Sequence, residues 1–250
     1  MTKGLSLVLM VLVALGFVLA LATCESEEEA ARGGGGSSID DDTGDDDDSY
    51  PGELALRVDD PTDQGLGKLM VTAPDYQEDL NSGTFTVKWD WLFEDGVVVH
   101  VAMFSTDELA EVNIAFEKQT DLIISAFDGN RGTYYACTGA LDFNTWYSVE
   151  VEVEPADKKF SVYVDGDATD CTDMGFALHS DDPVLQGLWI SASNVATGTT
   201  LIDNISFEKE GDTLFSEDWQ GYEPGDQPSD PWQMKQVMDT TFEIVEVQQD

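Results

Sequence analysis

Short runs of alternating apolar and polar residues recur along the chain after residue 50. The clearest pair lies within 146–164, on both sides of a polar turn at 155–158. Apolar side chains at every second position predict half-buried strands, so this stretch predicts a β-hairpin. The alternating apolar side chains are Tyr147, Val149, Val151, Val153, Phe160, Val162 and Val164, of which Tyr147, Val149, Val151, Phe160 and Val162 are expected to face the core.

Similar runs predict further strands, divided by Gly, Pro, Asp and Asn. No stretch carries a sustained helical period, and short strands at this spacing are typical of an antiparallel two-sheet sandwich. The sequence therefore predicts an all-β domain. Its further strands are expected at 54–58, 69–72, 84–92, 97–104, 112–116, 122–127, 134–137, 188–192, 201–207 and 241–247.

The hairpin also carries a recognisable motif. Trp146-Tyr147 opens one strand, and Tyr163-Val164-Asp165-Gly166 closes the next. This arrangement resembles the signature hairpin of the laminin-G-like, concanavalin A-like jelly rolls. The resemblance implies one jelly-roll sandwich over residues 50–250, and it implies a fold more than a ligand.

The order of motifs along the chain is unusual for that family. Residues 215–232 resemble the segment that normally precedes the first strands, yet here they follow 202–207, which resembles the closing strand. The tail at 241–247 would in the usual order lead into Leu56-Arg57-Val58. We therefore expect the last strand to lie beside the first, as in a circular permutant. The alternative is a truncated second domain that starts at Phe215.

Residues 1–23 have the features of an export signal. Lys3 is followed by a mostly apolar run, and Leu21-Ala22-Thr23-Cys24 resembles the bacterial lipobox, in which the cysteine becomes the acylated first residue. Thr23 departs from the Gly, Ala or Ser usual at that position. This predicts a lipoprotein of the bacterial cell envelope, at the outer membrane or cell surface. Cleavage after Ala22 instead would release a secreted or periplasmic protein.

Residues 24–49 differ in composition from the rest. They contain runs of Glu, Gly, Ser and Asp and almost no apolar side chain, so we expect a disordered acidic tether. A calcium loop would need oxygen ligands at defined spacing around a glycine turn, and Asp45–Asp48 lacks that arrangement.

The whole chain has 51 acidic and 11 basic Lys or Arg residues, a net charge of -40. Without the 11 acids of the tether and without Lys3 and Arg32, 40 acidic and 9 basic residues remain, so the domain itself is acidic. Such a charge repels phosphate backbones, and nucleic acid is therefore not an expected partner. The excess indicates either a saline or calcium-rich surrounding or bound divalent cations.

The three cysteines leave one unpaired in an exported chain. Acylation of Cys24 would leave Cys137 and Cys171 as an even pair, for which a disulfide is expected. Two separate buried thiols are the alternative.

No constellation of residues predicts an enzyme. Glu150, Glu152 and Glu154 share one face of a predicted strand, and laminarinase-like glycosidases of this fold carry Glu-x-Asp-x-Glu there, so the middle residue departs from that motif. His100 and His179 are too few for a three-histidine zinc site. We therefore expect a binding protein rather than a glycoside hydrolase or polysaccharide lyase.

A structural Ca²⁺ is the one cofactor that the resemblance implies. In related domains an acid of the closing strand and one of the opening segment can share the ion, and Asp203 and Asp218 match them. The alternative is that Asp203-Asn204 turns or caps the backbone.

The expected partner is a glycan or another extracellular polymer, with the membrane contacted through the lipid anchor alone. Sugar rings stack on aromatic side chains while their hydroxyls take hydrogen bonds. Asn130, Arg131 and Tyr134, in and beside one polar loop, are the residues expected to bind it. Further aromatic candidates are Tyr135, Trp189, Trp219, Tyr222 and Trp232. A structural or adhesion protein of the envelope without a small ligand is the alternative function.

Overall fold

The structure is a computed structural model, which describes residues 54–62, 67–96, 99–106, 108–118, 121–179, 182–192, 197–235 and 239–247. These belong to a compact unit that begins at Asp48. The expected export signal, the acylated Cys24 and the acidic tether lie outside the described residues. Within the described part of the chain, no helix is long and apolar enough to cross a membrane.

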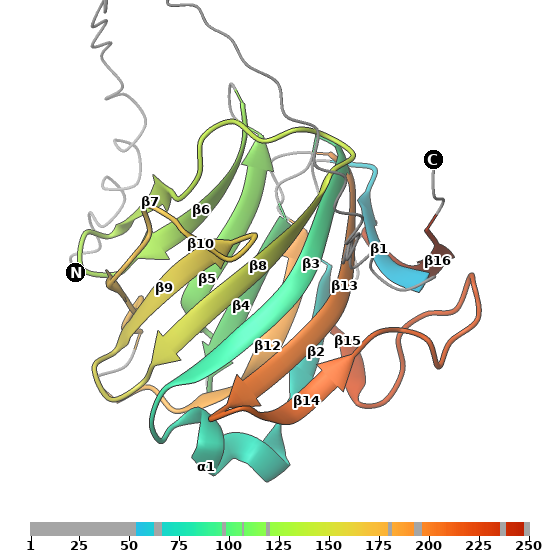
Figure 1. Cartoon of the computed structure of the whole chain (residues 1–250). Helices are drawn as coiled ribbons and strands as arrows, with labels where there is room; N and C mark the ends of the chain where they lie inside the picture. Colours follow the sequence, from blue (N-terminus) through green and yellow to red (C-terminus); the bar gives the residue numbers. More distant parts are fainter. Residues whose placement is uncertain are drawn as a thin grey trace, which may run out of the picture. The chain divides into compact units, whose positions relative to one another are not determined.

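The unit is an antiparallel jelly-roll sandwich of two sheets, as predicted (Figure 1). The nine strands of sheet A are β1 (Leu54–Asp60), β3 (Phe85–Asp95), β8 (Trp146–Glu154), β9 (Lys159–Val164), β10 (Asp167–Ala168), β11 (Met174–Gly175), β13 (Gly198–Lys209), β14 (Asp212–Glu217) and β16 (Thr241–Glu246). The seven strands of sheet B are β2 (Lys68–Thr72), β4 (Val99–Ser105), β5 (Ala110–Lys118), β6 (Leu122–Asp128), β7 (Thr133–Ala136), β12 (Leu185–Ala192) and β15 (Trp232–Lys235).

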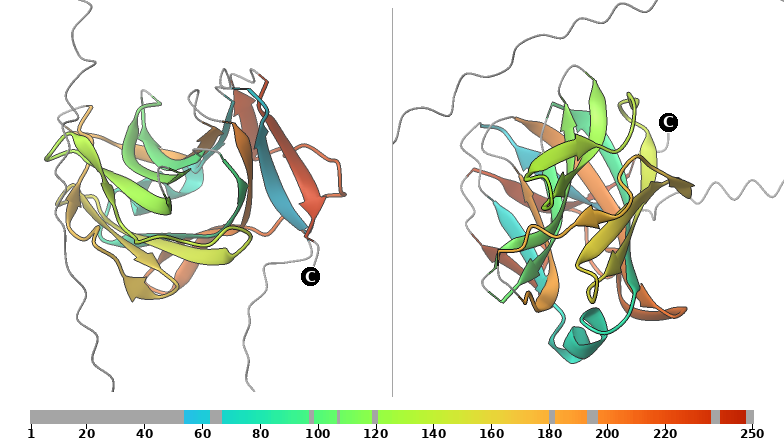
Figure 2. Two further views of the ribbon diagram at one scale, coloured as in Figure 1. Left: turned by 90° about the horizontal axis from the view of Figure 1, so that it is seen from above. Right: turned by 90° about the vertical axis from the view of Figure 1, so that its left-hand side faces the viewer.

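Neighbours in sheet A follow the order β10-β9-β8-β3-β13-β1-β16, and those in sheet B the order β15-β2-β12-β4-β5-β6-β7. The sheets lie face to face, and the main core fills the space between them (Figure 2). The predicted hairpin is the β8–β9 pair, in which Val151 pairs with Val162. All seven of its alternating apolar side chains belong to the core, including the five that were predicted to face it.

The two ends of the described chain meet in sheet A. β16 pairs with β1 in antiparallel register, from Leu54 opposite Glu246 to Asp59 opposite Thr241, so the expected pairing of last and first strands is confirmed. β14 extends sheet A along β13, and β15 extends sheet B along β2. Residues after Phe215 are therefore built into both sheets and do not start a separate domain.

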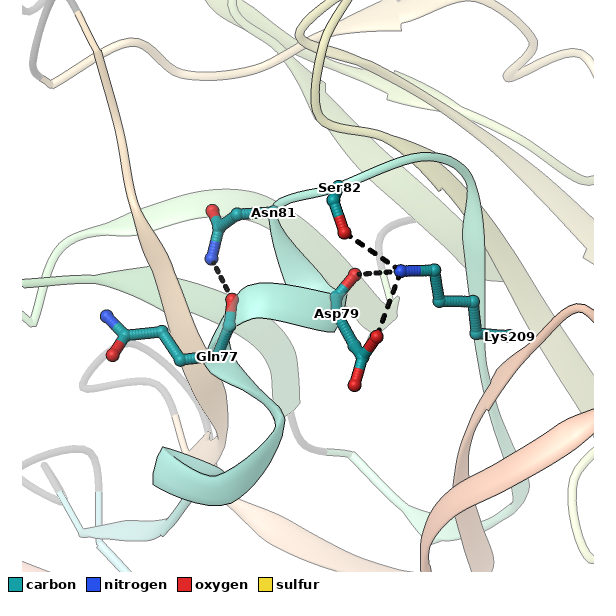
Figure 3. A network of polar contacts seen from close by, with 5 residues as sticks. All are labelled: Gln77, Asp79, Asn81, Ser82 and Lys209. Carbon is teal, nitrogen blue, oxygen red and sulfur yellow. Dashed lines mark hydrogen bonds and ion pairs between the residues drawn. The ribbon is translucent and has the colours of Figure 1, made fainter.

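One short helical segment was not predicted from the sequence. A 3₁₀ turn (Pro74–Tyr76) and α1 (Gln77–Leu80) connect β2 to β3. The Asn81 side chain donates to Leu185 O and accepts from Leu185 N, both at 2.8 Å. Lys209 Nζ contacts Asp79 Oδ1 at 3.1 Å and Ser82 Oγ at 3.0 Å (Figure 3). Polar contacts rather than helix length thus fix this connection to β12 and β13.

Candidate functional site

The cavity between the two sheets is too small to hold a ligand. The void between the sheets that Trp89, Met103 and Leu188 help to line measures about 10 Å³ and is apolar. This is about the volume of one water molecule, which is far too small for a sugar.

The outer face of sheet B brings together polar side chains from several strands. Successive side chains of a strand point to opposite faces, so residues between core positions face outward. By this alternation His100 of β4, Asn113 of β5 and Tyr134 of β7 share the outer face with Glu117 and Ser125. Hairpin pairing of β4 with β5 and of β6 with β7 places these side chains near one another.

Three of these side chains form a hydrogen-bonded row. Asn113 Nδ2 donates to the Tyr134 hydroxyl at 2.9 Å, and Asn113 Oδ1 lies 3.1 Å from His100 Nδ1. Because the amide oxygen can only accept, His100 carries its proton on Nδ1 in this contact. A neutral His100 therefore presents an unprotonated Nε2.

The surroundings keep both ends of the row neutral at pH 7. Burial lowers the pKa of His100, against the opposing effects of Asn113 and Glu117. Burial, together with the nearby Glu117 carboxylate, raises the pKa of Tyr134 to about 12. The row is thus an array of uncharged donors and acceptors.

Tyr134 also offers an aromatic surface. Its side chain is 39% exposed, and its ring packs against Phe127 with centres 5.3 Å apart. Beside it, Ser125 Oγ donates to Glu117 Oε1 at 2.6 Å. An exposed ring therefore lies near an amide, an imidazole and a carboxylate.

The far end of the same face is basic. Lys68 of β2 pairs with Lys235 of β15, and both point outward because Leu69, Trp232 and Met234 point to the core. Lys68 Nζ lies 4.6 Å from the centre of the Trp189 ring, a cation–π contact. Lys235 forms an ion pair with Glu108. Burial lowers the pKa of Lys68, and the charge of Lys235 adds to this effect while Glu108 opposes it.

The structure separates two of the ligand-binding residues predicted from the sequence. Arg131 Cζ lies 4.6 Å from the centre of the Tyr135 ring, whereas Tyr134 contacts Asn113. Tyr134 and Tyr135 are adjacent in β7 and therefore point to opposite faces. Arg131 and Tyr134 consequently do not form one site on the outer face of sheet B.

The loop around Asn130 is held by Asp128. Asp128 Oδ1 accepts from Asn130 N at 3.0 Å and from Gly175 N at 3.1 Å, and its Oδ2 lies 3.5 Å from Arg131 Nε. The Asn130 side chain packs so closely on Gly175 that a Cβ there would collide with it. Asn130 therefore joins β6 to β11 in the fold.

Three aromatic candidates are buried. Trp219 is fully buried and donates from Nε1 to Ile202 O at 3.1 Å, and Trp232 donates to Glu217 Oε2 at 3.0 Å. Trp189 is 7% exposed beneath Lys68, and Tyr222 is half-buried against Trp219. None of the three tryptophans offers an open platform to a sugar ring.

A disulfide joins Cys137 to Cys171, so the alternative of two separate thiols does not hold. It connects the end of β7 in sheet B to the loop after β10, where Cys171 O accepts from Val162 N at 2.9 Å.

Asp203 and Asp218, the expected calcium ligands, lie on neighbouring segments in different surroundings. Asp203 is buried in β13 and accepts from Asn204 N, whereas Asp218 is exposed and accepts from Gln220 N. In the part of the chain that the structure describes, no three His, Cys, Asp or Glu side chains are grouped to hold a metal. The calcium site stays a prediction, and a fall in the unfolding midpoint with chelator would support it.

The three glutamates of β8 lie on the outer face of sheet A, away from the row. Lys88 Nζ lies 3.6 Å from Glu150 and 2.9 Å from Glu208, while Glu154 pairs in register with Lys159. These carboxylates are part of a solvated, partly ion-paired surface.

Sequence reasoning missed Asn113, Glu117 and the pair of lysines as members of one surface. A signal was present, because Asn113 interrupts the apolar run 112–116 at an outward position. Its contact with His100 and Tyr134, however, depends on the lateral order of strands, which alternation does not reveal.

No protein-family model matches the chain, and no curated protein matches it either. Solved structures that it resembles include a sialidase, with a TM-score of 0.49 and 14% identity over 64% of this chain. The match spans 16% of the sialidase. An alginate lyase in complex with an alginate trisaccharide gives a TM-score of 0.46 and 12% identity, covering 62% of this chain and 81% of the lyase.

A carbohydrate-binding module from Bacillus subtilis gives a TM-score of 0.35 and 19% identity, covering 51% of this chain and 76% of the module. At such distances none of these similarities assigns a function to this chain.

Proposed function

We propose that this protein is an exported, membrane-tethered lipoprotein that binds a glycan or another extracellular polymer without transforming it. The outer face of sheet B is the binding surface. The observation that carries the proposal is the hydrogen-bonded row of His100, Asn113 and Tyr134 beside an exposed aromatic ring.

The chemistry of this row suits a sugar chain. A sugar presents CH groups that stack on an aromatic ring, and hydroxyls that both donate and accept. Tyr134 supplies the ring, while Asn113 and Glu117 supply amide and carboxylate groups nearby.

The tether is proposed from the lipobox-like sequence at Cys24 and the acidic segment 24–49. The Cys137–Cys171 disulfide supports export, because disulfides persist in oxidising compartments. Mass spectrometry of the mature N-terminus tests this. A diacylglycerol on Cys24 is expected, and an unmodified chain starting at Thr23 would overturn the tether.

The binding proposal is tested on a glycan array with two tyrosine variants. Tyr134→Ala removes the ring and breaks the row, so it is expected to lower affinity about tenfold or more. Tyr163→Ala is the matched control, because Tyr163 faces outward on sheet A. Equal binding by both variants, or no glycan bound by the unaltered protein, would overturn the proposal and leave the structural or adhesion role.

A polysaccharide lyase is the second candidate, favoured by one observation. A neutral His100 with a free Nε2 can accept a proton, and Tyr134 with a pKa of about 12 can donate one. Such a pair suits β-elimination of a uronic acid polymer. Incubation with polygalacturonate and alginate tests this, since unsaturated products absorb near 235 nm. No absorbance change at high protein concentration would exclude this reaction on both polymers.

A further inference from the structure

We propose that the polymer recognised by the outer face of sheet B is anionic, a carboxylate-bearing polysaccharide whose acidic groups bind at Lys68 and Lys235. This inference rests on the proposed function and names the class of ligand. The structural observation behind it is a surplus of positive charge and hydrogen-bond donors at one end of that face.

Two lysines face each other across a strand pair at this position. Lys68 and Lys235 are direct partners of β2 and β15, and like charges opposite one another destabilise a sheet. Lys235 is paired with Glu108. Among the residues that the structure describes, Lys68 forms no salt bridge and rests instead on the Trp189 ring. The Glu108 carboxylate thus attracts the ammonium groups of both Lys235 and Lys68.

Trp189 adds a further unsatisfied donor. Its indole is 7% exposed, and Nε1 is buried without an acceptor among the described residues. An indole nitrogen only donates, and a buried donor without an acceptor is costly. The donors that an anionic ligand can reach are therefore the Lys68 and Lys235 ammonium groups, and the buried Trp189 ring supports Lys68 from below.

The remainder of this face is poor in acid, although the domain is strongly acidic. Among the outward positions of the described strands of sheet B, the carboxylate that faces solvent is that of Glu117. It accepts a hydrogen bond from the Ser125 hydroxyl. Glu111, at the β-bulge of β5, is buried and accepts from His179 N. The repulsion that excludes polyanions from most of the surface is therefore weakest here.

The row and the basic end lie on one track of register pairs across the sheet, on which Ser191 and Ala115 are buried. Register pairs lead from Lys235 to Lys68, then to Ser191, His100 and Ala115. Neighbouring strands are about 4.8 Å apart, so this track spans several sugar units. A chain stacked on Tyr134 can reach the lysines with a carboxylate several residues away.

The test uses two polymers with the same sugar backbone, one charged and one neutral. Polygalacturonate is compared with its fully methyl-esterified form by affinity electrophoresis and calorimetry, with chelator present so that Ca²⁺ cannot bridge carboxylates. The protein is expected to bind polygalacturonate at least about tenfold more tightly than the ester. The double variant Lys68→Gln/Lys235→Gln should lose that difference.

A charge-matched control separates a local effect from a general one. Lys88→Gln/Lys159→Gln removes two positive charges from the outer face of sheet A and is expected to leave affinity unchanged. Equal losses in the two double variants would overturn the inference, as would equally tight binding of polyglutamate, which would show attraction to any polyanion.

Failure of the inference differs from failure of the proposed function. Tyr134-dependent binding of neutral glycans alone, unaffected by Lys68→Gln/Lys235→Gln, would overturn the anionic ligand while glycan binding stands. Binding of no polymer, neutral or anionic, would overturn both. Circular dichroism of each variant verifies that a loss of binding is not a loss of fold.

Discussion

The outer faces of the two sheets differ sharply in chemistry although both belong to one acidic domain. Sheet B presents neutral hydrogen-bonding groups, aromatic rings, two lysines and the Glu117 carboxylate, whereas sheet A presents carboxylates on most of its strands. The outward acids of sheet A are Asp59, Asp90, Glu150, Glu152, Glu154, Glu208 and Glu243. The net charge of a chain therefore says little about the charge of its binding surface.

The largest expected effect concerns the link between the two sheets. Cys137→Ser/Cys171→Ser opens a loop of 34 residues, and the loop-entropy relation gives a loss of about 3–4 kcal/mol in unfolding free energy. Denaturant unfolding measures this loss. Because Cys137 follows β7, the variant should also weaken glycan binding through Tyr134. Unchanged stability would show that packing alone holds β7 in place.

Placing an acid on each face tests the comparison directly. Ala102→Asp places a carboxylate at a buried position among Met70, Phe104 and Trp189, and its desolvation should cost about 2–3 kcal/mol in unfolding free energy. Chemical denaturation provides the measurement.

Thr86→Asp is the matched variant on sheet A. Thr86 lies between Glu152 and Glu208 at a half-buried position, so like-charge repulsion should cost less than about 1 kcal/mol and diminish with added salt. A larger cost for Thr86→Asp than for Ala102→Asp would contradict the contrast between the faces.

His100 gives the hydrogen-bonded row a pH dependence. Since burial lowers its pKa in the folded protein, the unfolded chain takes up the proton first as the pH falls below about 6.5. His100 therefore reduces stability in that range. Between pH 7.5 and pH 5, the unfolding midpoint of His100→Gln is expected to fall by about 1–2 °C less than that of the unaltered protein. Parallel curves for the two proteins would show that His100 protonates freely.

The smallest expected effect concerns Asp90, on the outer face of sheet A. Burial raises its pKa, assisted by Asp165 and opposed by hydrogen bonds from Asn204 and Ser148. The ionised form is therefore penalised in the folded state at pH 7, and the penalty disappears below about pH 3.9. Asp90→Asn should raise the unfolding midpoint by about 1–2 °C at pH 7. A lower midpoint would mean that the carboxylate is needed by Asn204.

The sequence was sufficient for the fold class, because alternation is a local property. It identified the β8–β9 hairpin, and the motif order predicted that β16 lies beside β1. β14 and β15 were not predicted as strands, since their alternation is weak and tertiary contacts fix them. Trp219 and Trp232 illustrate this, as each buries a ring and donates a hydrogen bond to a residue more than ten positions away in the sequence.

The candidate site was less accessible to sequence reasoning. Tyr134 could be selected because it lies beside a polar loop, but its neighbour Tyr135 has the same residue type and the opposite direction. Because successive side chains of β7 point to opposite faces, Arg131 contacts Tyr135 while Asn113 contacts Tyr134. The approach of Lys68 to Lys235 depends on β15, a strand that follows β2 by more than 150 residues.

The pairing of β1 with β16 has a mechanical consequence. The chain enters the sandwich at Leu54, and β1 is bonded to β13 on one side and to β16 on the other. Tension applied ahead of Leu54 is therefore received by an interior strand, which can leave only when both ladders break. Forced unfolding is governed by the height of such a barrier rather than by equilibrium stability. The ladder between β16 and β1 thus resists the extraction of β1 under tension.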